Sequence, residues 1–189
     1  MRWLHTYASM AGLGALLFFA LTGLTLNHPD WTFGTRPSTH RITGKMRVEW
    51  LKPGDDAKSV NRLAVVEFLR QAHGVTGLVD DFRVEDDEAS LAFKGPAFSA
   101  DAVIQRKTGA YQLTVTREGW VALVNDLHKG RHTGTGWAWV IDVSAGLLAL
   151  IAASGLWLLL YVRRRRASGL WIGILGAGAV AILYALLVR

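Results

Sequence analysis

Three histidines mark the places where apolar stretches of the chain meet polar ones. His28 follows the first apolar stretch, whereas His128 and His132 stand just before the second. The chain contains no cysteine, which excludes thiolate ligands and cysteine-held iron–sulfur clusters and leaves histidine as the main ligand for a transition metal or a haem iron. Histidines gathered at one boundary therefore indicate either a b-type haem site or a site that holds iron or copper directly.

The spacing of the histidines limits how they could act together. His5 and His28 are 23 positions apart, which separates them by about 34 Å on one helix, so they cannot bind one haem. His128 and His132 share a face if their segment is helical, so only one of them can be an axial ligand opposite His28. We predict His132 for that role because it is nearer the apolar stretch, with His128 contacting a propionate or solvent. A hinge bent at its glycines would exchange the two roles.

Each histidine also has a simpler interpretation. His28 could be a polar residue that anchors a helix end at the membrane surface, and His128 and His132 could belong to a solvated turn. His5 lies among apolar residues near the start of the chain. We expect its side chain to extend to the membrane surface; the alternative is a second ligand site shared across a dimer.

Charged residues near the histidines extend the predicted site. Lys129, Arg131 and Arg36 suit haem propionates, because charge-assisted hydrogen bonds to carboxylates are strong; the alternative is that they face lipid phosphates. Asp142 lies five positions into the second apolar stretch, about 7 Å into a bilayer, where an acid is costly and usually faces protein. We expect Asp142 to orient a ligand histidine through a hydrogen bond. The alternative is that it lies at a hydrated interface between helices.

Three apolar stretches are long enough to cross a bilayer, which requires about 20 residues. They are Trp3–Leu26, Trp137–Val162 and Leu170–Val188. We therefore predict a membrane protein with three transmembrane helices and a small α+β domain inserted between the first and the second. The predicted limits are 1–28 for the first helix, 29–119 for the domain, 120–136 for an interfacial helix and hinge, 137–162 for the second helix, 163–169 for a basic loop and 170–189 for the third helix.

Positive charge predicts the orientation of these helices. Arg163–Arg166 and Arg2 lie at helix ends that belong in the cytoplasm, which places residues 29–136 outside. Between Pro29 and Leu127 the chain carries 13 Lys and Arg against 14 Asp and Glu, so the net charge of +6 comes from the helix ends. The basic balance thus reflects contact with the lipid bilayer, and nucleic-acid binding is excluded as a function.

The sequence pattern of the inserted domain predicts one helix packed on an antiparallel sheet. Arg41–Trp50 alternates as a strand does, Pro53-Gly54-Asp55 predicts a turn, and Lys58–His73 has helical spacing with Asp55 or Asp56 as N-cap. Four short alternating segments predict further strands: Asp81–Val84, Ser90–Phe93, Ala102–Arg106 and Tyr111–Thr116. Trp120, Leu123, Val124 and Leu127 then form an apolar stripe, which we expect to lie on the membrane surface.

The third apolar stretch carries small residues at every fourth position, namely Gly169, Gly173, Ala177 and Ala181. Small residues at this spacing allow two membrane helices to approach closely. The stripe therefore predicts a homodimer, or packing against the first helix of the same chain.

Several short motifs, taken in order, resemble those of the PepSY-associated transmembrane proteins. They are Trp3-Leu4-His5, Leu21-Thr22-Gly23, the strand–helix–sheet segment, Leu127-His128-Lys129-Gly130 and Ser154-Gly155-Leu156-Trp157. The resemblance implies a PepSY-like periplasmic domain in the inner membrane of a bacterium. It also implies b-type haem held by membrane histidines and a link to the reduction of iron-siderophores or other periplasmic acceptors. Larger relatives have more helices.

These observations favour an inner-membrane haem b protein that passes electrons to a periplasmic acceptor, as a membrane reductase or its electron-transfer subunit. Its electrons would come from a quinol or a redox partner protein, because the chain has no Gly-x-Gly-x-x-Gly or P-loop motif for a nucleotide cofactor. The alternatives are a membrane-tethered PepSY module that binds another protein, and a metal-uptake accessory protein in which His28, His128 and His132 hold the ion.

Overall fold

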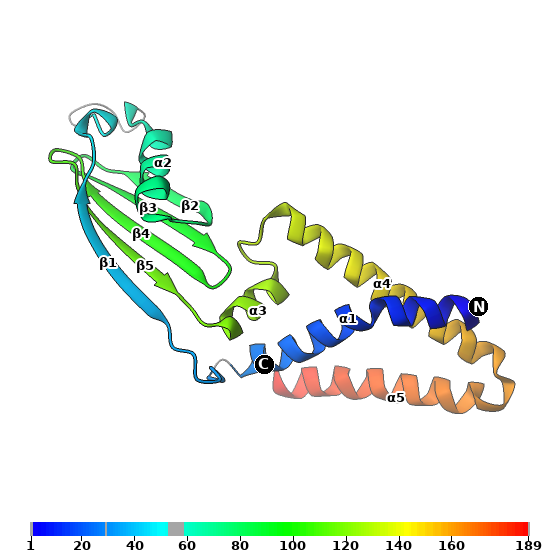
Figure 1. The fold of residues 1–189 in the computed structure, drawn as a ribbon. Coiled ribbons are helices and arrows are strands. Elements are labelled where there is room, and N and C mark those ends of the chain that lie inside the picture. Colours follow the sequence, from blue (N-terminus) through cyan, green and yellow to red (C-terminus); the bar gives the residue numbers. More distant parts are fainter. Residues whose placement is uncertain (1, 29, 53–58, 189) are drawn as a thin grey trace. The chain divides into compact units, whose positions relative to one another are not determined.

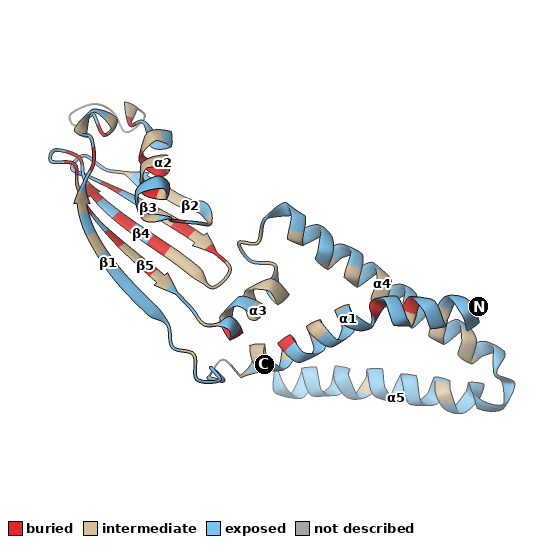
Figure 2. Cartoon of the chain, in the orientation of Figure 1, coloured by how far each residue is buried: buried red, intermediate tan, exposed pale blue. Residues whose placement is uncertain are grey.

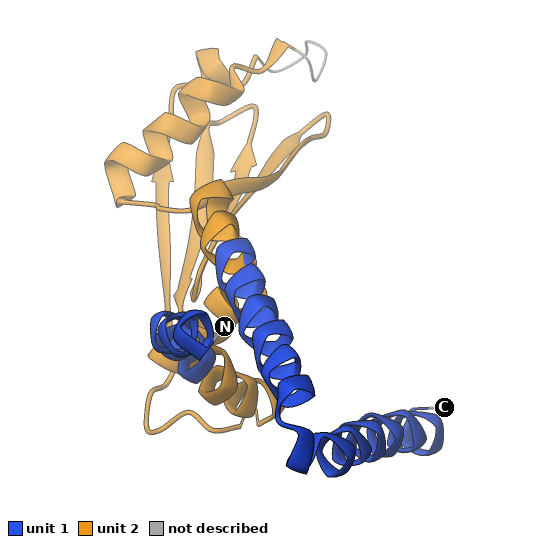
Figure 3. Ribbon diagram, turned by 90° about the vertical axis from the view of Figure 1, so that its right-hand side faces the viewer, with its two compact units in different colours: residues 1–18, 142–189 blue, residues 19–141 orange. Residues whose placement is uncertain are grey.

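The computed structural model describes residues 2–28, 30–52 and 59–188. The chain divides into two compact units, one formed by residues 19–141 and the other by residues 1–18 with 142–189 (Figure 3). The first unit contains the sheet domain and the second contains most of the long helices.

Three helices in the described part of the chain are long and apolar enough to cross a membrane. They are α1 (Arg2–Asn27), α4 (Gly134–Tyr161) and α5 (Arg163–Leu187), with mean hydropathies of 1.8, 2.2 and 2.2. Almost all of their residues are exposed or half-buried (Figure 2), as expected for helices whose apolar side chains face lipid. The prediction of three apolar membrane helices is confirmed.

The connection between the second and third membrane helices differs from the prediction. Residues 163–169, expected as a loop, form the first turns of α5, and Val162 alone separates the two helices. Arginine is a good helix former, and the Arg163–Arg166 run contains no glycine or proline to stop a helix. Leu159 and Gly169 lie close together on the two sides of this hinge. A Cβ added to Gly169 would lie only 2.6 Å from the Leu159 side chain.

The sheet domain has five antiparallel strands with helix α2 (Arg62–His73) on one face (Figure 1). The strands are β1 (Ser38–Lys45), β2 (Leu78–Val84), β3 (Glu88–Gly95), β4 (Phe98–Gln105) and β5 (Ala110–Arg117), in the spatial order β1-β5-β4-β3-β2. Alternate residues of the central strands are buried against α2, where Val65 and Leu69 meet Phe93 and Leu113 in one core. The predicted small α+β domain is confirmed.

Two element boundaries in this domain were predicted wrongly. The strand expected at Arg41–Trp50 is β1, which pairs with β5 until Lys45 faces Ala110; beyond that point β5 offers no partner, and the chain forms the short helix η1 (Val48–Trp50). Helix α2 begins at Arg62 and not at Lys58. Its N-cap is Asn61, whose side chain accepts a hydrogen bond from the backbone N of Ala64 at 3.1 Å. The expected Pro53-Gly54-Asp55 turn and the expected caps Asp55 and Asp56 lie outside the described residues.

A buried arginine holds the domain together at the end of β4. Arg106 is 2% exposed. Its guanidinium donates hydrogen bonds to the backbone carbonyls of Leu51, Lys52, Glu85 and Asp86, at 3.2, 2.8, 2.9 and 3.1 Å. It therefore ties the segment after η1 to the turn between β2 and β3. The planar fork of arginine suits this arrangement, because it presents five N–H groups in fixed directions.

Candidate functional site

The C-terminal part of α1 and the short helix α3 (Trp120–Lys129) are joined by side-chain hydrogen bonds. Thr25 Oγ1 donates to Asn125 Oδ1 at 2.6 Å, and one turn earlier Thr22 Oγ1 lies 2.6 Å from Nδ1 of His128. The Phe19 ring meets the imidazole edge-on, with ring centroids 5.2 Å apart. His128 is therefore held against the membrane helix that precedes the domain, by a residue more than a hundred positions away in the chain.

The contacts of Thr22 show which nitrogen of His128 is engaged. The Thr22 hydroxyl lies 2.6 Å from Nδ1 of the imidazole and 3.5 Å from the carbonyl of Phe19, so Nδ1 is the nitrogen bonded to the helix. In the tautomer with the proton on Nδ1, Nε2 has the lone pair that can bind a metal. Gly23 lies beside the ring: a Cβ at that position would come 3.7 Å from its Cε1 atom. A histidine oriented through one nitrogen and open at the other is the usual state of a metal ligand.

His132 is positioned quite differently from His128. Helix α3 ends at Lys129, where Gly130 takes the left-handed conformation (φ 66°), and His132 follows in a turn with φ 56°. The shared helical face proposed for His128 and His132 is therefore wrong, because the glycine ends the helix between them. The positive charge of His132 contributes to lowering the pKa of Asp80, although the hydrogen bond from Lys94 is the main cause.

His28 follows the last residue of α1 and stacks on Trp31, with ring centroids 4.2 Å apart and an angle of 9° between the rings. Within the described residues, no group of three His, Cys, Asp or Glu side chains comes close enough to hold a metal ion. The structure thus orients His128 for ligation but does not gather His28, His128 and His132 around one ion.

The charged residues predicted near the site are distributed over several surfaces. Arg36 and Arg131 are exposed, and neither has an ion-pair partner among the described residues. Lys129 lines a cavity instead. Asp142 is exposed on α4, in the other compact unit, and its hydrogen bond to a ligand histidine stays a prediction.

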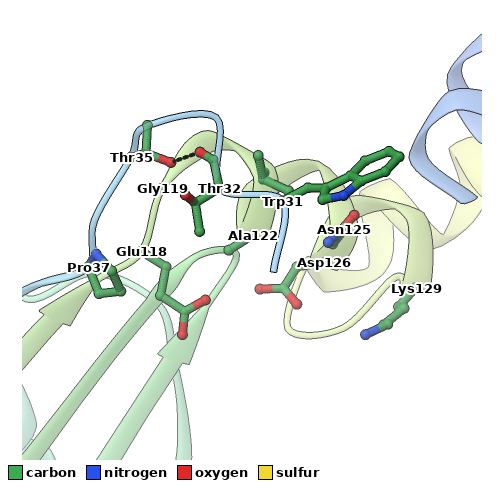
Figure 4. Close-up of a pocket in the computed structure, with 11 residues that line it drawn as sticks. Trp31, Thr32, Thr35, Pro37, Glu118, Gly119, Ala122, Asn125, Asp126 and Lys129 are labelled. Carbon is green, nitrogen blue, oxygen red and sulfur yellow. Dashed lines mark hydrogen bonds between the residues drawn. The ribbon is translucent and has the colours of Figure 1, made fainter. Parts of the chain in front are cut away.

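The cavity beside α3 has a volume of about 260 Å³ (Figure 4). Asp126 and Lys129 extend from α3 and Glu118 from the end of β5, whereas Trp31 comes from the segment after α1. The remaining lining residues are Thr32, Thr35, Pro37, Gly119, Val121, Ala122 and Asn125. This cavity could not be predicted from local sequence patterns, because its walls come from segments about ninety residues apart.

The other compact unit contains a second histidine in the same kind of setting. Nδ1 of His5 lies 2.9 Å from Oγ of Ser154, a residue that is 7% exposed, and Ser154 donates its own proton to the carbonyl of Ile151 at 2.9 Å. His5 Nδ1 is therefore the donor, and Nε2 keeps the lone pair. The expectation that His5 extends to the membrane surface was wrong, since the ring packs against Gly155, where a Cβ would lie 3.2 Å from Cε1.

The two histidine settings use the Thr-Gly and Ser-Gly motifs that carry the family resemblance, although the sequence did not show which histidine each motif contacts. Each ring meets a hydroxyl residue followed by glycine on a membrane helix, Thr22-Gly23 for His128 and Ser154-Gly155 for His5. A family model described as PepSY_TM-like matches residues 1–189. The chain belongs to this family. The predicted resemblance is thereby confirmed, and the PepSY_TM-like protein is a membrane protein. Comparisons with curated proteins and with solved structures gave no match.

Proposed function

We propose that this PepSY_TM-like protein is a b-type haem protein of a bacterial inner membrane that passes electrons to an acceptor at the periplasmic face, such as a ferric siderophore. The observation that carries the proposal is the 2.6 Å hydrogen bond between Nδ1 of His128 and Thr22. In this proposal the N-terminus is cytoplasmic and the sheet domain periplasmic, as the arginines at the helix ends favour.

The donor set of the described residues fits one axial bond to a haem iron. His128 presents an imidazole whose orientation is fixed by Thr22, and Gly23 leaves space beside the ring. When bound, haem supplies a one-electron couple whose potential depends on its ligands and on the hydrogen bonds to them. The role of the chain is to hold the ring, to fix its proton on Nδ1 and to surround the site with apolar side chains such as Phe19.

The second axial position has two candidates within the same unit. His28 would have to leave its stacking contact with Trp31 to reach an iron opposite His128, and His132 would have to turn inward from its loop. We therefore exchange the predicted roles: His128 is the principal ligand, and His28 or His132 completes the pair. His5 is a candidate for a separate ligand site, because Ser154 fixes its proton in the same way. Electrons would come from a quinol or from a redox partner protein.

The absorption spectrum of the purified full-length protein tests the proposal, together with iron content and haem extraction. We expect a Soret band, and sharp α and β bands on reduction. His128→Ala should lose most of the haem, whereas His40→Ala, which changes an exposed histidine on β1, should keep it. A wild-type protein that never holds haem, even after expression with added haem precursor, contradicts the proposal.

A second candidate function is a membrane-tethered module that binds another protein through the sheet. The face of the sheet turned away from α2 carries a polar row across three strands, in which Arg41 pairs with Thr114 and Thr114 pairs with Asp101. A hollow of about 350 Å³ lies beside Asp81, Arg83 and Ser90 on this face. A haem-free protein that captures a soluble partner through this face would favour the module.

A further inference from the structure

The cavity beside α3 contains charges that the chain does not neutralise. Among the described residues, neither Glu118 nor Lys129 forms an ion pair or a side-chain hydrogen bond. Asp126 uses one carboxylate oxygen to accept a hydrogen bond from the backbone N of Ala97 at 2.9 Å. The cavity therefore offers two carboxylates and one ammonium group, and its wall includes the indole of Trp31 (Figure 4).

The cavity lies at the end of a membrane helix. Asn125, one of its lining residues, accepts the hydrogen bond from Thr25 in the last turns of α1. Trp31 is four positions past Asn27, the last residue of α1, and so within about 14 Å of it along the chain. The headgroup layer of a bilayer occupies this level, roughly 5–8 Å beyond the hydrocarbon on each side. If α1 crosses a bilayer, lipid headgroups are therefore within reach of the cavity.

Exposed aromatic residues adjoin the cavity on its Trp31 side. The rings of Trp31, Phe33 and Trp120 form a chain, with centroids 6.3 and 5.5 Å apart, and each of the three is at least 43% exposed. Phe33 has φ 47°, a conformation that costs energy for a residue other than glycine. Aromatic side chains, and tryptophan above all, are enriched at the boundary between headgroups and acyl chains. The cluster thus gives the acyl part of a lipid a place beside the charged cavity.

We propose that the cavity binds the headgroup of a phospholipid that carries both a phosphate and a primary amine, as phosphatidylethanolamine does. Lys129 binds the phosphate, and Glu118 and Asp126 accept hydrogen bonds from the ammonium group. An anionic headgroup without an amine meets two carboxylates for one lysine, and a quaternary amine has no N–H to donate. The volume of 260 Å³ is several times the share of about 30 Å³ that one water molecule occupies, so a small headgroup has room. The proposal is independent of haem.

Native mass spectrometry of the full-length protein in detergent tests the proposal. The protein is supplied with equal amounts of phosphatidylethanolamine, phosphatidylglycerol and phosphatidylcholine that carry the same acyl chains. We expect preferential retention of phosphatidylethanolamine. Glu118→Gln and Lys129→Gln should each weaken this binding roughly tenfold, the effect of losing one charge-assisted hydrogen bond. Glu88→Gln and Lys45→Gln are the matched controls, because both residues are exposed on strands and lie outside the cavity.

Three outcomes would overturn the proposal. Equal or stronger retention of phosphatidylglycerol shows that the amine is not recognised. Unchanged retention in both cavity variants places the lipid elsewhere on the protein. Free phosphoethanolamine that binds as tightly as the lipid, measured by its competition in the same spectra, shows that the ligand is a soluble molecule. Circular dichroism of each variant separates loss of binding from loss of fold.

Discussion

Nδ1 of His128 lies 2.6 Å from Oγ1 of Thr22, although the two residues are 106 positions apart in the chain. This hydrogen bond links the end of the first membrane helix to the last helix of the sheet domain, and it decides which imidazole nitrogen is open to a ligand. The same relationship recurs between His5 and Ser154. A hydroxyl group on a membrane helix therefore contacts Nδ1 of each histidine.

Replacing Thr22 by Val tests the role of this hydroxyl. Valine has almost the same shape but cannot accept the proton of Nδ1, so we expect haem affinity to fall by about 10–100-fold, the usual effect of removing the partner of a ligand histidine. The haem content and midpoint potential of the purified protein are the measurements. Thr22→Ser keeps the hydroxyl and should have the haem content and midpoint potential of the wild-type protein. Thr25→Val, which breaks the neighbouring hydrogen bond to Asn125, is the control. Equal haem content in the Thr22→Val and wild-type proteins contradicts the assigned role.

The sequence predicted the three membrane helices and the approximate positions of the strands along the chain, because each depends on local patterns. Twenty apolar residues span a bilayer wherever they occur, and alternate residues of a strand face one core. It did not predict the site, because the partner of His128 is distant in sequence. The end of the helix between His128 and His132 could be predicted locally, because Gly130 follows the apolar stripe of α3 and takes the left-handed conformation. Which of the two histidines is a ligand stays a prediction.

Replacing Arg106 by Lys should destabilise the sheet domain strongly. Lysine keeps the charge but cannot reach the four carbonyls that the guanidinium binds, and buried carbonyls without a donor cost about 1–3 kcal/mol each. We expect the free energy of unfolding to fall by about 3 kcal/mol, measured by denaturant titration of the domain's circular dichroism. Arg83→Lys, at a side chain that is 73% exposed, should change it by less than about 0.5 kcal/mol. Similar effects of the two substitutions would show that the carbonyl contacts of Arg106 contribute little.

Tyr111 predicts how the stability of the domain changes at alkaline pH. Burial raises the pKa of this phenol above its usual value of 10.0, because the charged form loses its hydration. A group whose pKa is raised by folding stabilises the protein fully below its unfolded pKa, and that contribution disappears as the pH rises through the folded pKa. Stability should therefore fall above about pH 10. The stability of the Tyr111→Phe variant should fall less steeply with pH, even though this variant also loses the 2.6 Å hydrogen bond to His73. Parallel pH profiles of the two proteins, measured by thermal unfolding, would rule this out.

Reporter fusions test the proposed orientation of the membrane helices. A reporter that is active only in the periplasm should be active when fused at Gly109, in the turn between β4 and β5, and inactive when fused at Ser168, within the basic start of α5. The reason for this expectation is that four consecutive arginines at a helix end favour its cytoplasmic placement. A cytoplasm-active reporter at the same positions provides the control and should show the opposite pattern. The reverse result would place the sheet domain in the cytoplasm.

Two glycines of α5 allow a direct test of the proposed homodimer. A Cβ on Gly173 would have no atom of the described residues within 4 Å, so a larger side chain at this position starts in open space. If a second copy packs against this face, Gly173→Leu should shift the detergent-solubilised protein from dimer to monomer, because the bulky side chain keeps the helices apart. Gly169→Leu is the contrasting variant: it clashes with Leu159 inside the chain and should lower thermal stability. Light scattering coupled to gel filtration measures the mass of the protein. A monomeric wild-type protein, or a Gly173→Leu variant that is still a dimer, would show that this face of α5 is not a dimer interface.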